Sequence, residues 1–449
     1  MPTFNSLLDY VSAIVRNEKI HARRFAGWLR EKLWVRPAIY CAGAVIAVSL
    51  STTAKYLPFA DLAPELGENL LSTLMSILTA SMLGVTAFAV GSMVSAFNSV
   101  GTNATPRAFS IIVSDDISKS ALSSFIGAFI FGAIGTIALE SKFFDKSELF
   151  ALFCITLLVY ARVIWVLVTW IDAIARLGRM GTAISRVEDV TRKTLVVAAS
   201  NPLMGAGPWD DGATKHSPVF SDDVGYVQDI DMSALQEIAN NNDMIVHISA
   251  SPGAFVGPGR PVAYVEGRSE TFNDAKIANA FFVGQQRNFA SDPRFGFVVL
   301  SQIAARALSP GINDPGTAID VLGSVTRLLM EWTKKRTMQQ MKWESGSDAV
   351  EFSRLRYKPV TVDELLENGF GSVAVYGAGQ IEVMLHLQRY LQLLAAASDG
   401  GLYNAAEKFS GEAFERSKLE MEFQGDIDKM KLERKEVLRI VKDSRNTMS

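Results

Sequence analysis

The run LFALFCITLLVYARVIWVLVTWIDAI at residues 149–174 decides the class of this chain, because Arg162 is its one charge before Asp172. A helix needs about 20 apolar residues to cross a bilayer. Three further runs, at residues 37–57, 70–97 and 121–139, have a similar length and hydrophobicity. The sequence therefore predicts a four-helix transmembrane domain over residues 37–174.

The composition agrees with a chain that has a membrane part and a soluble part. Hydrophobic residues make up 49% of the chain, charged residues 20%, and the mean hydropathy is +0.17. A net charge of −3 gives no global basic surface, so we expect no nucleic-acid partner. The two cysteines, Cys41 and Cys154, both fall in apolar runs and are expected to be buried hydrophobic residues.

The distribution of basic residues predicts the orientation of the spans. Seven Lys and Arg residues lie between residues 16 and 36, whereas the loop after the first run holds Lys55 against three acidic residues. By the positive-inside rule the N-terminus is cytoplasmic, and four crossings return the chain to that side. We therefore expect a multi-pass membrane protein with both termini cytoplasmic.

The membrane helices contain a few polar residues that are candidates for a pore. Ser72, Ser76, Thr79 and Thr86 place hydroxyl groups along the second run, and Arg162 lies deep in the fourth. In a homo-oligomer, a ring of Arg162 side chains would favour anions. The alternatives are that the hydroxyls only accompany small-residue helix packing, and that Arg162 extends to the cytoplasmic headgroups.

The rest of the chain is divided by composition into segments on either side of the spans. Residues 1–36 form an amphipathic cytoplasmic helix, which lies either on the inner leaflet or against the cytoplasmic domain. Residues 175–216 form a helical stalk and linker, 217–268 a small β module, 269–398 a helical domain and 399–449 a charged C-terminal helix. The predicted fold class is thus mainly α, with a four-helix transmembrane domain and a cytoplasmic α+β domain.

Capping residues and breaks locate individual elements in this cytoplasmic part. Asp231 caps a short helix, and Thr361 with Glu364 forms a capping box. Asn273 is expected to cap a helix through Phe282, and Asp292 to cap one that begins at Pro293. We expect a polar insert at residues 332–347, one helix at 373–397 and another at 405–442.

The glycine-rich turn at residues 253–259 is similar to the Gly-x-x-Val-x-x-Gly turn of biotinyl and lipoyl carrier domains. Those domains carry their cofactor on a lysine, and this segment has none. We therefore predict no cofactor.

The turn LSPGINDPGTA at residues 308–318 is the main candidate site outside the membrane. Backbone N–H groups at a helix start attract anions, so the turn and its flanks could hold an ion or a small anionic ligand. The alternative is a helix stop followed by a helix cap, with Asp314 as N-cap and Pro315 in the first turn. The candidate residues are Arg306, Ser309, Asn313, Asp314, Thr317 and Asp320.

No pattern of catalytic residues indicates an enzyme. The histidines at positions 21, 216, 247 and 386 are scattered, and no metal-binding or nucleophile motif accompanies them. We expect His247 and His386 to be packing residues, and we predict no metal site.

Three runs in a fixed order after the spans resemble a known family. They are GYVQDIDMSALQEIA, SPGAFVGPGRPVAYV and DPRFGFVVLSQIAARALSPGINDPGTA. The chain resembles, over about residues 37–397, the domain of unknown function 2254 family of predicted bacterial membrane proteins. The resemblance implies four membrane helices and a cytoplasmic domain, and it implies no particular activity.

Two functions fit these observations. The first is an oligomeric channel or transport-type protein with a cytoplasmic regulatory domain. The second is a membrane-anchored sensor or scaffold that binds a ligand or partner without conduction. Both have the lipid bilayer as a partner, and both admit a homo-oligomer.

Overall fold

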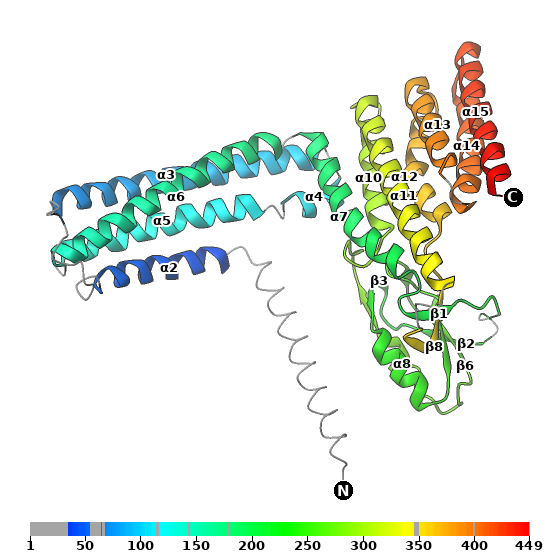
Figure 1. The fold of residues 1–449 in the computed structure, drawn as a ribbon, viewed down its shortest axis with the longest axis horizontal. Coiled ribbons are helices and arrows are strands. Elements are labelled where there is room, and N and C mark those ends of the chain that lie inside the picture. Colours follow the sequence, from blue (N-terminus) through cyan, green and yellow to red (C-terminus); the bar gives the residue numbers. More distant parts are fainter. Residues whose placement is uncertain are drawn as a thin grey trace, which may run out of the picture. The chain divides into compact units, whose positions relative to one another are not determined.

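The computed structural model of the chain divides into two compact units (Figure 1). The membrane unit comprises Met1–Val100 with Ile112–Gly178, and the second unit comprises Gly101–Ile111 with Arg179–Ser449. The structure describes residues 35–53, 64, 68–103, 105–113, 116–141, 144–177, 179–212, 214, 216–344, 350–397 and 400–448. The predicted helix at residues 1–36 thus lies almost wholly outside the described residues.

Long helices that run lengthwise beside one another make up the membrane unit (Figure 1). Leu71, Met75, Phe125 and Leu152 are among its fully buried side chains, while large apolar side chains such as Leu158 remain exposed. A helix that is apolar all round suits a lipid environment. The helices are α2 (Val35–Ser51), α3 (Glu68–Asn103), α5 (Asp116–Glu140) and α6 (Lys146–Leu177), with the short α4 (Pro106–Val113) between α3 and α5.

Among the described residues, three helices are long and apolar enough to cross a bilayer, so the predicted count of four is not confirmed. These spans are Asn69–Asn98, Ile117–Glu140 and Lys146–Arg176. In the run at residues 37–57, the described helix is α2 (Val35–Ser51), which has 17 residues. At 1.5 Å per residue such a helix is about 25 Å long, less than the roughly 30 Å of the hydrocarbon core.

The second unit contains two β-sheets. The larger has the strand order β1-β8-β4-β6-β2, and the smaller has the order β5-β3-β7. Their shared core is rich in Val, Ile and Ala, and the β-branched Val and Ile fit a pleated surface. The strands are β1 (Ala206–Pro208), β2 (Ser217–Phe220), β3 (Gly225–Ile230), β4 (Ile245–Ile248), β5 (Phe255–Val256), β6 (Pro261–Glu266), β7 (Phe281–Gly284) and β8 (Phe352–Tyr357).

The helices of the second unit pack on one another, and the strands gather at one end of them (Figure 1). Helix α7 packs along α11 and α10. The helices are α7 (Met180–Ser200), α8 (Met232–Asn241), α9 (Ala275–Ala278), α10 (Phe295–Ala307), α11 (Pro315–Glu344), α12 (Val362–Tyr376), α13 (Ile381–Ala395), α14 (Gly400–Glu420) and α15 (Gln424–Met448).

Two of the predicted caps are confirmed. The Asp231 carboxylate accepts a hydrogen bond from the Ala234 backbone N–H at 2.9 Å, at the start of α8. Thr361 and Glu364 form the reciprocal capping box that begins α12. Both caps are decided by residues close together in the chain, which is why the local pattern is sufficient.

Other predicted elements are wrong in their extent. The helix expected to run through Phe282 ends at Ala278, because Phe281–Gly284 pairs with β3. Helix α10 begins at Phe295 and not at Pro293, and the Asp292 carboxylate pairs with the Arg287 guanidinium at 2.5 Å. The other corrections are that α11 continues to Glu344 through the expected polar insert, and that the long runs at 373–397 and 405–442 are each broken by a turn.

Candidate functional site

Arg162 lies near the midpoint of α6, and its side chain is exposed on the membrane unit. Its Nη2 donates a long hydrogen bond of 3.4 Å to the hydroxyl of Tyr40 on α2. Among the described residues no acidic side chain pairs with Arg162. Two turns further along α6, Trp170 is buried against Phe88 and Phe125.

An open cavity of about 420 Å³ lies beside Arg162, between α2, α5 and α6. Most of its lining is apolar, including Ala44 and Phe131. Tyr40, Ser124 and Arg162 contribute the polar side chains. The volume exceeds that of several water molecules, each of which occupies about 30 Å³ in the liquid.

The hydroxyls predicted for a pore lie on α3 and in part bond to their own helix. Thr79 donates to the Met75 carbonyl at 2.8 Å, and Thr86 donates to the Met82 carbonyl at 2.6 Å. Ser76 is exposed and Ser72 is half-buried. The structure therefore satisfies the two threonine donors within the helix, as is usual for such residues in lipid.

The small residues of the membrane helices have two different environments. On α5, a Cβ added at Gly132 would come within 2.4 Å of the Thr79 hydroxyl, and one at Gly127 within 2.8 Å of the Tyr40 side chain. On α3, a Cβ added at Gly84 or Gly91 would meet nothing within 4 Å. The small face of α5 is thus used inside the unit, whereas that of α3 is left open.

The turn at residues 308–318 joins α10 to α11 and is held by its own hydrogen bonds. The Asp314 carboxylate accepts from the Thr317 backbone N–H at 3.1 Å and from the Thr317 hydroxyl at 2.6 Å. The hydroxyl bond is the main reason that the pKa of Asp314 lies below its usual value. Asn313 adopts a left-handed backbone with φ of 49°, and Ser309 donates to the Arg306 carbonyl at 2.6 Å.

The side chains of the other two candidates at this turn, Arg306 and Asp320, do not share these hydrogen bonds in the described part of the chain. Among the described residues, neither the Arg306 nor the Asp320 side chain bonds to another candidate of the turn. The Arg306 Nε is buried without a hydrogen-bond partner there, while Asp320 is exposed. The geometry accounts for Asp314 as a cap, and a ligand site at the turn stays a prediction.

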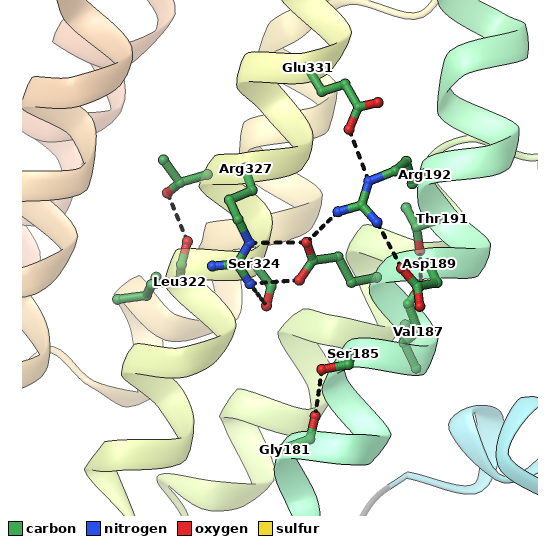
Figure 2. Close-up of polar contacts among 12 residues, drawn as sticks. Gly181, Ser185, Val187, Asp189, Thr191, Arg192, Leu322, Ser324, Arg327 and Glu331 are labelled. Atoms are coloured by element: carbon green, nitrogen blue, oxygen red, sulfur yellow. Dashed lines mark hydrogen bonds and ion pairs between the residues drawn. The ribbon is translucent and has the colours of Figure 1, made fainter.

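A cluster of charged residues between α7 and α11 was not foreseen from the sequence. Glu188 on α7 is 5% exposed, and its carboxylate accepts from Arg327 Nη2 at 2.7 Å, Arg327 Nε at 3.0 Å and Arg192 Nη2 at 2.7 Å. Arg192 Nε donates in turn to Glu331 at 2.9 Å. Figure 2 shows the guanidinium groups of Arg192 on α7 and Arg327 on α11 on either side of one carboxylate, with Ser324 beside Arg327.

The pKa of Glu188 follows from this cluster. Burial raises it, but the hydrogen bonds from Arg327 and Ser324 and the positive charges lower it more, so it lies below its usual value of 4.5. Glu188 is therefore a charged structural group at neutral pH. Glu188 and Arg327 are 139 positions apart, so no local pattern could have paired them.

A second unforeseen group joins two histidines that are far apart in the sequence. His216 and His247 stack with ring centroids 5.3 Å apart, and both approach the Glu266 carboxylate. Burial lowers the pKa of His247 below its usual value of 6.5, against the effect of Glu266. His247 was expected to be a packing residue, and it is buried. Its contacts with His216 and Glu266 were not expected from the sequence, because the strand pairing of β2, β4 and β6 creates them.

Comparison with known proteins places most of the chain in one family. The family described as "Predicted membrane protein (DUF2254)" matches residues 30–393. Two uncharacterised proteins, from Mycobacterium tuberculosis and Mycobacterium bovis, are each 28% identical to the chain over 111 residues. The match covers 23% of this chain and about a fifth (21%) of the length of each relative. No solved structure matches the chain.

Proposed function

Because the chain belongs to the DUF2254 family of predicted membrane proteins, we propose that it is an oligomeric, anion-selective channel or transport-type protein. The second unit has a regulatory role in this proposal, and no enzymatic reaction is involved. The observation that carries the proposal is the charge of Arg162 in the middle of an apolar helix of 32 residues.

Arg162 has only a weak partner for its charge among the described residues. An arginine at the centre of a membrane helix costs at least about 2.5 kcal/mol on insertion scales, and such residues usually face protein or water. The Tyr40 hydroxyl at 3.4 Å is a weak partner for a full charge. A water-filled path or a transported anion would satisfy Arg162, and the adjoining cavity of about 420 Å³ offers the space for either.

The open face of α3 supports the oligomer. Ser76, Ala80, Gly84, Ala87 and Gly91 are all exposed, and they recur every three to four residues along the helix. Small residues at this spacing let membrane helices approach closely. Association of copies through this face would bring several α3 helices, with their hydroxyls, around a common axis.

A bacterial inner-membrane location with both termini cytoplasmic is part of the proposal and requires α2 to be a fourth crossing. Helix α2 packs along α5, and its outer side chains Ile39, Val45, Ile46 and Leu50 are apolar and exposed. Local thinning of the bilayer accommodates a helix that is a few ångström short. The excess of basic residues before α2 favours the cytoplasmic side for the N-terminus.

The test is ion flux through liposomes that contain the purified full chain. We expect chloride flux that falls at least about tenfold in Arg162→Leu and is retained in Arg162→Lys, because the lysine keeps the charge. Arg176→Leu is the matched control, since Arg176 lies at the end of α6 and is paired with Asp172 at 3.1 Å. An intact oligomer without flux at varied pH, voltage and membrane tension, or unchanged flux in Arg162→Leu, would overturn the proposal.

A second candidate function is a membrane-anchored sensor or scaffold without conduction. The observation that favours it is a cavity of about 300 Å³ in the second unit, whose lining includes Thr194, Asn201, Trp332, Arg336 and Tyr357. Burial raises the pKa of Tyr357 to about 12, so its hydroxyl keeps its proton at neutral pH. Aromatic and polar side chains around one hollow suit a small ligand.

The same preparation separates the two functions. A sensor shows a ligand-dependent rise in the unfolding temperature of the second unit without flux. Thr194→Val and Tyr357→Phe should reduce that rise if the ligand lies in the cavity, while Arg162→Leu should leave it unchanged.

A further inference from the structure

Three potential metal ligands meet at one end of the five-stranded sheet. In this sheet β6 lies between β4 and β2. His247 on β4 is opposite Tyr264 on β6, two residues before Glu266, so His247 and Glu266 share a face. Ser217 on β2 is opposite Val265, which puts His216 level with Glu266 on that same face. The register of the strands, and not their order in the sequence, creates the group.

The donor atoms are close enough to share one ion. Glu266 Oε2 lies 3.6 Å from His247 Nε2 and 3.8 Å from His216 Nε2. All three donor groups lie within 4.8 Å of one another. Zinc bonds of about 2.0–2.2 Å to nitrogen and oxygen in a tetrahedron place the ligand atoms about 3.4 Å apart. A small tilt of the partly exposed His216 ring would reach that separation.

His247 is an independent indication that something is bound here. Its side chain is 2% exposed, and neither ring nitrogen has a hydrogen-bond partner among the described residues. Trp209 meets the imidazole edge-on at 6.0 Å, and His216 stacks on it, so the ring is held with a nitrogen toward Glu266. A buried polar atom without a partner is costly, and a bound ion would supply the partner that the ring lacks.

We propose that His216, His247 and Glu266 bind a divalent transition-metal ion, with zinc as the preferred ion. Two imidazoles and one carboxylate are a ligand set that suits zinc and its neighbours in the first transition series. His216 is 29% exposed and Glu266 is 47% exposed, so the fourth position opens toward solvent. Water or an anionic group of a small ligand fills that position. This site is separate from the membrane unit and does not depend on conduction.

The experiment uses the full chain in detergent, purified through a tag without histidines and stripped of metal. Zinc is titrated in competition with a chromogenic chelator, and cobalt is added separately to report the coordination by its visible spectrum. We expect one ion per chain, a cobalt spectrum of four-coordinate type, and a zinc-dependent rise in unfolding temperature. His216→Gln and Glu266→Gln should each weaken zinc binding by about 100-fold or more, because even loss of an outer partner costs 10–100-fold.

Control variants separate the loss of a metal ligand from a general loss of folding. His386→Gln alters a histidine on α13 that lies beside Tyr390 and outside the group, so zinc binding should be unchanged. The substitutions at His216 and Glu266 concern partly exposed side chains, and their folding is checked by circular dichroism. The proposal is overturned if the wild-type chain takes up no stoichiometric zinc, or if folded His216→Gln and Glu266→Gln bind zinc as the wild type does.

Discussion

Glu188 in the second unit and Arg162 in the membrane unit are both charges in the middle of a helix, but the described residues satisfy only one of them. The Glu188 carboxylate accepts three hydrogen bonds of 2.7–3.0 Å from Arg192 and Arg327. Arg162 has one hydroxyl at 3.4 Å. A charge with all its partners inside the chain is explained by the fold. A charge without them requires water, lipid, a second copy or an ion as its partner.

Removing Glu188 should have the largest effect on stability. Glu188→Ala leaves the guanidinium groups of Arg192 and Arg327 without their buried acceptor, and we expect the free energy of unfolding to fall by about 3 kcal/mol. This is the low end of the range for a broken buried pair, because Arg327 is 61% exposed and can turn toward water.

Denaturant unfolding of the purified chain measures this loss. Asp189→Ala is the matched control one residue further along α7, since Asp189 is 65% exposed and, among the residues that the structure describes, forms an ion pair with Arg192 alone. Its loss should be below about 1 kcal/mol, as for exposed ion pairs. Equal losses in the two variants would show that burial of Glu188 contributes nothing.

Removal of the Arg162 charge should be favourable, because it should ease insertion of α6 into the membrane. Arg162→Leu removes a charge that the described residues do not pair with an acid, so insertion of the α6 segment should become more favourable by about 2.5 kcal/mol. Glycosylation mapping of that segment measures the insertion free energy, with Arg176→Leu as the control at the helix end. A loss of stability of the folded protein in Arg162→Leu would mean that the chain itself satisfies the charge.

Acid should lower the free energy of unfolding of the second unit, because Glu188 becomes protonated. The folded-state pKa of Glu188 lies below the unfolded value of 4.5, so as the pH falls the unfolded state takes up the proton first. The contribution is complete above about pH 4.5 and is lost below it. We expect the stability difference between wild type and Glu188→Gln to shrink by about 1 kcal/mol per pH unit in that range. A difference that stays constant between pH 6 and pH 3.5 would contradict this assignment.

Patterns of nearby residues in the sequence were sufficient to predict part of this fold. Apolar runs located the three long membrane helices, and side-chain caps located the starts of α8 and α12. The break of the run at residues 373–397 has a local cause as well, because Gly377 ends α12 and its N–H bonds to the Val373 carbonyl at 2.8 Å. Such features depend on residues within a few positions of one another.

The remaining features depend on contacts between distant segments. The larger sheet recruits β1 and β8 from outside the predicted β module at residues 217–268. The division of the run at 405–442 lets α15 fold back along α14, and the prediction of one continuous helix missed that turn. The pairs Glu188–Arg327 and His247–Glu266 arise in the same way, from helix packing and strand register, so no local pattern in the sequence could predict them.

Substitutions in the turn at residues 308–318 should have the smallest effect on stability. They extend the comparison of Glu188 with Arg162 to the carboxylate of Asp314. Asp314, like Glu188, has its partners in the chain, so it should behave as a structural group. Asp314→Ala should cost about 1 kcal/mol through the lost cap, whereas Asp314→Asn, which can still accept from the Thr317 N–H, should cost a few tenths. Thermal unfolding of the two variants measures the difference. If Asp314→Asn keeps its stability but abolishes ion flux or ligand binding, the carboxylate charge itself is required, and the turn is then a site as well as a helix corner.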